Sequence, residues 1–123
     1  MALTMAGAPP AAAQLQRFDG AWDVSMSCAS TPDGVRGFKW SFPAEISGGL
    51  FLGRFHESGT SPSATLSGRI EANGNAALSM DGITGNSNYN INAAPRGMPF
   101  HFDVTAHFDP RAGAGKRIAG RDC

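Results

Sequence analysis

The sequence predicts an all-β domain, an antiparallel up-and-down barrel of eight strands, with a two-sheet β-sandwich as the alternative. Three observations predict this class. From Phe18 onward apolar residues recur at every second position, which is the period of a strand and not of a helix. The 123 residues include 16 glycines and 8 prolines, an unusually large share for a helical protein. Short, turn-rich segments separate the alternating runs, so consecutive strands are expected to pair with each other.

Eight alternating runs are expected to form the strands, in chain order 20–28, 38–46, 50–56, 64–71, 76–80, 88–93, 100–108 and 116–123. The segments between them have the composition of turns and loops. Asp33-Gly34 follows the first run, Ser47-Gly48-Gly49 is a tight reversal, and Asn73-Gly74 supplies the positive backbone angles of a two-residue hairpin. The polar stretches 57–63 and 81–87 are expected to be loops. Closing the eight strands into a barrel would remove the exposed edges of a flat sheet.

The apolar face of each run is read from its alternation. The first strand places apolar residues from Trp22 to Cys28 on one side, and the second does so from Phe38 to Ile46. The run 100–108 is the clearest, with an apolar residue at every even position. Glycines inside the expected strands, Gly53 and Gly68, fit sharp bends or a close approach of two backbones.

The N-terminal residues resemble the end of a secretory signal. Residues 1–13 are small, apolar and uncharged, and they finish in three alanines that match an A-x-A cleavage pattern. The basic region that begins such signals is missing, so a flexible tail is the alternative. We divide the chain into 1–17, a signal-peptide remnant or N-terminal tail, and 18–123, a single β-barrel domain. The expected location is the periplasm or the extracellular medium.

The two cysteines, Cys28 and Cys123, are expected to form one disulfide, which export would permit. The bridge would join the end of the first strand to the last residue of the chain. In a simple antiparallel pairing these positions lie at opposite ends of their strands, so the bridge needs the stagger of a tilted barrel. Two independent thiols are the alternative.

The charge balance excludes several classes of partner. Ten basic and ten acidic residues give a net charge of zero, which removes the long-range field expected of a protein that binds nucleic acid or acidic membranes. No apolar run approaches the roughly 18 residues needed to span a bilayer. A small basic group near the C-terminus, of Arg111, Lys116, Arg117 and Arg121, could steer an anionic ligand to one rim, or form a solvated strand and loop.

Two short motifs resemble known barrels. Gly20-Ala21-Trp22 resembles the G-x-W opening of lipocalin-like and avidin-like barrels, which implies that Trp22 plugs one end of the barrel. Residues 49–55 (GLFLGRF) are similar to the G-x-L-x-G-x-Y stretch of an avidin-type strand, with phenylalanine in place of its leucine and tyrosine. An avidin would imply biotin binding through several later tryptophans. This chain has only Trp22 and Trp40, both early, so the biotin site is not matched.

The apolar stripe has two interpretations. Its aromatic residues can fill an eight-stranded barrel, whose interior is just wide enough for side chains. If the filling is incomplete, they would line a cavity for a small apolar or flat ligand, with Arg54, Tyr89 and Asn90 as polar contacts near its mouth. The candidate ligand-binding residues are Trp40, Phe42, Arg54, Phe55, Tyr89, Asn90 and Phe102.

Candidate catalytic chemistry is sparse. His101, Asp103 and His107 share one face of a strand, but the two histidines are six residues apart, roughly 20 Å, so one metal ion cannot bridge them. No serine lies in a G-x-S-x-G elbow, and the stretch 113–116 lacks the spacing of a phosphate-binding loop. We therefore predict no catalytic residue, no metal and no cofactor.

These observations favour a non-enzymatic exported barrel that binds a small apolar or flat ligand at its mouth. The alternative is a protein-interaction or self-assembling module that uses its outer surface. An asparagine-rich face, formed by Asn86, Asn88, Asn90 and Asn92, could pair between chains in a homo-oligomer. An enzyme that uses His101 and Asp103 is the third hypothesis.

Overall fold

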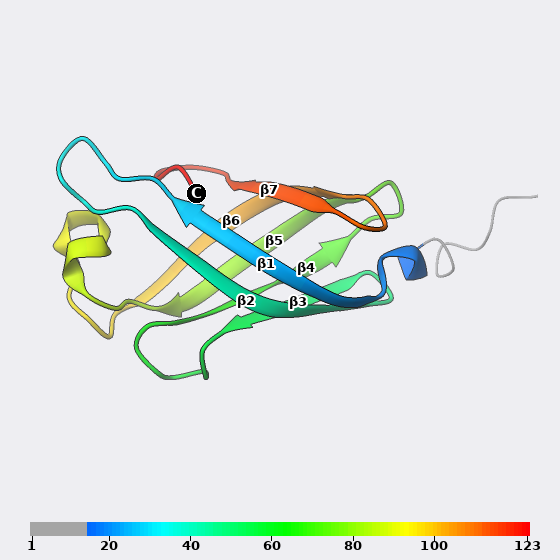
Figure 1. Ribbon diagram of the computed structural model, residues 1–123, viewed down its shortest axis with the longest axis horizontal. Coiled ribbons are helices and arrows are strands. Elements are labelled where there is room, and N and C mark those ends of the chain that lie inside the picture. The colour runs from blue at the N-terminus through cyan, green and yellow to red at the C-terminus, as the bar shows by residue number, and fades with distance from the viewer. Residues whose placement is uncertain (1–14) are drawn as a thin grey trace, which may run out of the picture.

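In the computed structural model, which describes residues 15–123, the chain forms one antiparallel sheet of seven strands that pair in sequence order (Figure 1). The expected export signal within 1–13 lies outside the described residues. The strands are β1 (Gly20–Cys28), β2 (Phe38–Ser47), β3 (Leu50–Phe55), β4 (Ser63–Ile70), β5 (Asn75–Ile83), β6 (Pro99–Phe108) and β7 (Gly113–Arg117). Three short 3-10 helices, η1 (Gln16–Phe18), η2 (Ser87–Tyr89) and η3 (Ile91–Ala93), complete the described chain.

The predicted all-β, up-and-down class is confirmed, but the expected barrel is not closed. The sheet curls into a half-barrel, and in the described residues β1 and β7 do not pair with each other (Figure 1). Because all seven strands belong to one sheet, the two-sheet sandwich is wrong. The inner face of the curl therefore remains open along a seam between β1 and β7.

The expected strand over 88–93 is wrong because asparagine side chains satisfy the local backbone. The Asn86 side chain accepts the backbone N–H of Asn88 at 2.9 Å. The Asn90 side-chain amide donates to the carbonyls of Gly85 at 3.1 Å and Ala94 at 2.8 Å. Such bonds compete with a sheet ladder. The segment forms η2 and η3, and the asparagine-rich strand face proposed for self-assembly does not exist.

The predicted last strand, 116–123, is also wrong in its position. The strand is β7, which begins at Gly113 and ends at Arg117. The remaining residues, 118–123, form a tail that is hydrogen-bonded to the loop after β1. The backbone N–H of Ala29 donates to the carbonyl of Asp122 at 2.8 Å. The tail thus reaches β1 through isolated contacts and not through a ladder.

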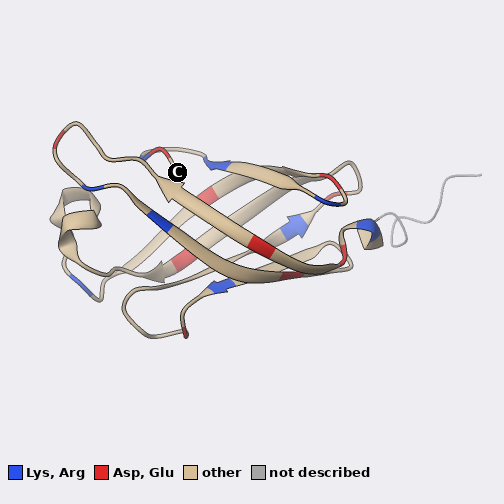
Figure 2. Cartoon of the chain, viewed as in Figure 1, with Lys and Arg blue, Asp and Glu red and all other residues tan. Residues whose placement is uncertain are grey.

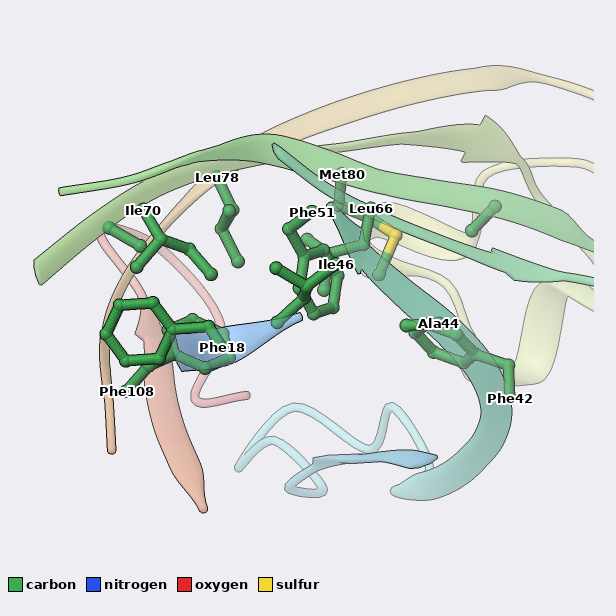
Figure 3. Packing of buried hydrophobic residues seen from close by; sticks show 12 residues of the cluster. Phe18, Phe42, Ala44, Ile46, Phe51, Leu66, Ile70, Leu78, Met80 and Phe108 are labelled. Atoms are coloured by element: carbon green, nitrogen blue, oxygen red, sulfur yellow. The ribbon is translucent and has the colours of Figure 1, made fainter. Parts of the chain in front are cut away.

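Apolar residues at alternate positions of the strands form the core on the inner face of the curl (Figure 3). At the end of the core near η1, Phe18 is fully buried and Phe108 packs against it with ring centroids 6.4 Å apart. Trp22 meets Phe108 edge-to-face at 5.5 Å and donates its indole N–H to the Phe18 carbonyl at 2.8 Å. Aromatic side chains therefore pack against one another at this end of the half-barrel.

The two glycines inside strands mark close approaches. A Cβ at Gly68 would lie 2.3 Å from the carbonyl oxygen of Ala77 on the neighbouring strand. A Cβ at Gly53 would lie 2.9 Å from the ring of Phe42. Any larger residue would push the facing strand or ring away, so both positions keep the curl of the sheet tight.

The predicted disulfide between Cys28 and Cys123 is confirmed, with the two Cα atoms 4.0 Å apart. The route differs from the expected one, because the tail after β7, and not a staggered last strand, carries Cys123 to the end of β1. A disulfide of this kind indicates an oxidising compartment. None of the helices in the described part of the chain has the length and apolar character that crossing a membrane requires.

Replacing both cysteines (Cys28→Ser with Cys123→Ser) is expected to lower the free energy of unfolding by about 2–5 kcal/mol, because the bridge closes a very long loop of the unfolded chain. The two residues are 95 positions apart. Urea unfolding followed by circular dichroism measures the change. Reductant should lower the urea midpoint of unfolding of the wild type and should not change that of the double variant. Equal midpoints for the two proteins without reductant would contradict a stabilising bridge.

Candidate ligand-binding site

A cavity of about 690 Å³, the mouth cavity, opens at the end of the half-barrel opposite to η1. It lies beside the loop from β1 to β2, the segment with η2 and η3, and the C-terminal tail, which come together at one end of the sheet (Figure 1). Its size is within the range of small-molecule sites. In a sequential antiparallel sheet every second connection lies at the same end. The connections from β1 to β2 and from β5 to β6 therefore both border the mouth cavity.

Five aromatic side chains, all half-buried, line the mouth cavity: Phe38, Trp40, Tyr89, Phe100 and Phe102. Phe38 lies 5.1 Å from Trp40 and meets Tyr89 edge-to-face at 6.4 Å, both measured between ring centroids. Phe100 and Phe102 are near-parallel at 6.1 Å. Flat apolar walls of this kind suit an apolar or aromatic ligand.

The structure brings four of the seven predicted ligand-binding residues to this cavity: Trp40, Tyr89, Asn90 and Phe102. Phe42 and Phe55 lie behind the wall. The Phe55 ring stacks on Trp40 at 4.2 Å, and Phe42 lies 6.3 Å from Phe55. Arg54 does not reach the cavity, because it is exposed on the outer face of β3, between the inward-facing Gly53 and Phe55.

Asn90 shapes the cavity wall. Its amide nitrogen already donates to the carbonyls of Gly85 and Ala94, within the segment that forms η2 and η3. The amide oxygen is the one group of this side chain with remaining capacity to accept a hydrogen bond. Asn90 therefore positions the loop of η2 and η3 against the aromatic wall.

Arg121 is the central polar residue of the site, and the alternation pattern does not reveal it. Only 9% of its surface is exposed. The guanidinium donates to the carbonyls of Ala29 at 3.0 Å, Tyr89 at 2.7 Å and Arg36. It also lies over the Phe38 ring, 5.0 Å from the centroid. One side chain thus ties the tail to both loops that border the cavity.

The charge of Arg121 is not neutralised by an acid. No carboxylate of residues 15–123 forms an ion pair with it. Burial lowers the pKa of Arg121, and the nearby positive charge of Arg117 lowers it further. The carbonyl oxygens supply the compensation, since a guanidinium offers donors in a planar fork. In the sequence, the one indication of this role is that Arg121 lies two residues before Cys123, which forms the disulfide.

Arg117 is the second arginine of the mouth cavity. It is the last residue of β7, and its guanidinium lies 4.5 Å from the centroid of the Phe102 ring. Its Nε donates to the carbonyl of Ala119 at 2.7 Å. The side chain is half-buried and follows the inner face of the sheet. Of the basic group predicted near the C-terminus, Arg117 and Arg121 reach the cavity, whereas Arg111 and Lys116 are exposed elsewhere.

A second cavity, of about 520 Å³, follows the open seam between β1 and β7. Inward-facing residues on both sides of the seam, among them Val24, Met26, Val104 and Ala106, are only half-buried. A closing strand would cover them. This seam is therefore a direct consequence of the missing contact between the two edge strands.

The histidine and aspartate residues singled out on the outer face form a small exposed network. His101 Nδ1 donates to Asp81 at 2.6 Å, and Nε2 lies 3.1 Å from an Asp103 oxygen. His107 instead contacts the Asn75 side chain at 2.9 Å, so the two histidines do not share a site. In the described residues no group of three metal-ligating side chains is placed to hold a metal ion.

The hydrogen bond to Asp81 raises the pKa of His101 above its ordinary value of 6.5, and the charges of Asp81 and Asp103 add to this. Its side chain is more than half exposed and lies on the opposite face of β6 from Phe100 and Phe102, although His101 is among the residues that line the mouth cavity. The network is a surface feature of β5 and β6.

No family model matches this chain, and searches of curated proteins and of solved structures found no match. The features it shares with barrel proteins are those of the fold, an antiparallel sheet curled into a half-barrel.

Replacement of the buried arginine, Arg121→Gln, is expected to lower the free energy of unfolding by about 3 kcal/mol or more, because the carbonyls of Ala29, Arg36 and Tyr89 lose a charged donor. Arg121→Lys should not restore it, since a single ammonium cannot replace the planar fork. The exposed Arg111→Gln is the matched control and should stay within about 0.5 kcal/mol of the wild type. Equal effects at the two positions in urea unfolding would refute the role of Arg121.

Asp81→Asn is expected to lower the pKa of His101, because its hydrogen bond is the main cause of the raised value. Histidine NMR titrations measure the change, with the distant Asp33→Asn as a control. Because the folded-state pKa lies above that of the unfolded chain, the interaction stabilises the fold fully below about pH 6.5 and is lost as the pH rises through the folded value. An unchanged titration in Asp81→Asn would show that this contact does not form.

Proposed function

We propose that this protein is a non-enzymatic binding protein that takes one small apolar or flat ligand in the mouth cavity. The observation that carries the proposal is the aromatic wall of a cavity of about 690 Å³ at the open end of the half-barrel. Concave apolar sites with a few convergent polar groups are the usual form of small-molecule sites.

The incomplete burial of the wall supports this proposal. Phe38, Trp40 and Phe102 are apolar residues on the inner face of the sheet, yet each is only half-buried. Inner-face positions nearer to η1, such as Ile46 and Phe51, are covered almost completely (Figure 3). A bound apolar ligand would remove the exposed aromatic surface from water, which is the main source of affinity for such ligands.

A relationship to the avidin-like or lipocalin-like barrels is part of the proposal. The resemblance implies that the tryptophan of the G-x-W motif plugs one end of the barrel. Trp22 packs on Phe108 at the end near η1 and donates to the Phe18 carbonyl, which agrees with that role. The ligand would then enter from the opposite end, where the mouth cavity lies.

We also propose a periplasmic or secreted location. The disulfide between Cys28 and Cys123 supports it, because such bridges persist in oxidising compartments. The small, apolar N-terminal residues add the pattern of an export signal.

Titration with N-phenyl-1-naphthylamine, a flat neutral probe whose fluorescence rises in apolar surroundings, tests the proposed site. Trp40→Leu is expected to weaken binding of the probe roughly tenfold, about 1.4 kcal/mol, because it removes part of the aromatic wall. Trp22→Leu is the matched control, since Trp22 lies outside the mouth cavity, and it should change the affinity by less than about twofold.

Circular dichroism of both variants establishes that each is folded at the assay temperature. If the probe does not bind the wild type, the proposed function is wrong. If only Trp22→Leu weakens binding, the probe occupies the seam between β1 and β7, which Trp22 lines, and the mouth cavity is not the site.

A further inference from the structure

We propose that the ligand of the mouth cavity is an amphipathic anion, an apolar or aromatic body with a single carboxylate-like head, and that Arg117 binds the head. This inference rests on the proposed function and names the chemical class of its ligand. The charge, the donors and the position of Arg117 carry it.

The side-chain charge of the mouth cavity is positive. Arg96, Arg117 and Arg121 line it, and in the described part of the chain no aspartate or glutamate does. Lys39 and His101 also belong to the lining, although the alternation of the strands turns their side chains to the outer face. Over the whole molecule both signs are distributed along strands and loops (Figure 2). Within the mouth cavity, by contrast, the charged side chains of the lining are basic.

The three arginines differ in the donors that they have left. Arg121 donates hydrogen bonds to carbonyl oxygens through its Nε and both terminal nitrogens. Arg96 donates to the Ser61 carbonyl at 3.2 Å and is exposed at the rim. Arg117 donates only through Nε, and its two terminal nitrogens make no hydrogen bond or ion pair to any residue of 15–123. Two parallel N–H groups match the two oxygens of a carboxylate.

Arg117 also lies where an amphipathic ligand needs a cation. Its guanidinium covers the Phe102 ring at 4.5 Å, so a head group bound there places its apolar body along the wall of Phe100 and Phe102. The main-chain oxygen of Cys123 is close by and accepts the backbone N–H of Arg117 at 3.3 Å, but it forms no ion pair with either guanidinium. The head group would accept hydrogen bonds from the two terminal nitrogens of Arg117.

Electrostatics favour the anion over a neutral ligand of the same shape. Arg117 and Arg121 repel each other closely enough to lower the pKa of Arg121. An anion between them and the solvent reduces this repulsion. Because the site is partly shielded from water, the attraction is stronger there than on an open surface.

Displacement of bound N-phenyl-1-naphthylamine by decanoate, decan-1-ol and decylammonium at neutral pH tests the inference. The three compounds share one apolar chain and differ in the charge of the head. Decanoate is expected to displace the probe at a concentration at least tenfold lower than decylammonium, and lower than decan-1-ol. Added salt should weaken the binding of decanoate more than that of decan-1-ol, because salt screens the attraction between the carboxylate and the arginines.

Variants of Arg117 assign the effect to one residue. Arg117→Gln is expected to weaken the binding of decanoate about tenfold and to change the affinity for decan-1-ol by less than about twofold. Arg117→Lys should still bind decanoate more tightly than decan-1-ol. Arg54→Gln, on the outer face of β3, removes the same charge from the molecule and should leave all three affinities in place. Probe binding and circular dichroism establish that each variant is folded.

The outcomes separate this inference from the proposed function. If the probe binds the wild type and the three compounds displace it equally, the ligand class is wrong and the binding function stands. If Arg117→Gln and Arg54→Gln weaken decanoate by the same factor, Arg117 is not the head-group contact and the inference fails. If the probe does not bind the wild type at all, both proposals are overturned.

Discussion

The attachment of the C-terminal tail to the loops after β1 and β5 is the constraint on which the rest of the structure depends. The half-barrel has no ladder between β1 and β7 in the described residues, so the two edges need another link. The disulfide supplies a covalent one, and Arg121 adds hydrogen bonds to Ala29, Arg36 and Tyr89. These contacts hold three separate segments at one end of the sheet. Backbone hydrogen bonds add to them: the N–H of Ala29 donates to the carbonyl of Asp122 at 2.8 Å, and the N–H of Arg36 donates to the carbonyl of Asn88 at 3.0 Å.

The same constraint creates the site. At the end near η1, Phe18, Trp22 and Phe108 fill the interior. At the other end the fastened loops stand around the inner face without filling it, and Phe38, Trp40 and Phe102 remain half-buried. The tail also brings the buried Arg121 to this cavity, where Arg96 and Arg117 are the other arginines of the lining. The contacts that hold the tail and the loops in place thus also place the walls of the mouth cavity.

Strand periodicity predicted most of the fold and part of the site. The runs 20–28, 38–46 and 100–108 correspond closely to β1, β2 and β6, because a period of two is a local property that pairing preserves. The same logic predicted Trp40 and Phe102 on the inner face. It failed at 88–93, where asparagine side chains bonded to the backbone. It also places Arg54 opposite to Phe55, which is why that arginine lies outside the cavity.

The sequence by itself determined the all-β class, the sequential antiparallel order, the apolar inner face and the pair of cysteines available for a bridge. Only the tertiary structure decided that β1 and β7 stay apart, that 118–123 is a tail and that Arg121 is buried among carbonyls. The physical reason is the range of the interactions. Alternation and turn chemistry act between near neighbours, whereas Arg121 meets groups up to 92 positions away, which no local pattern records.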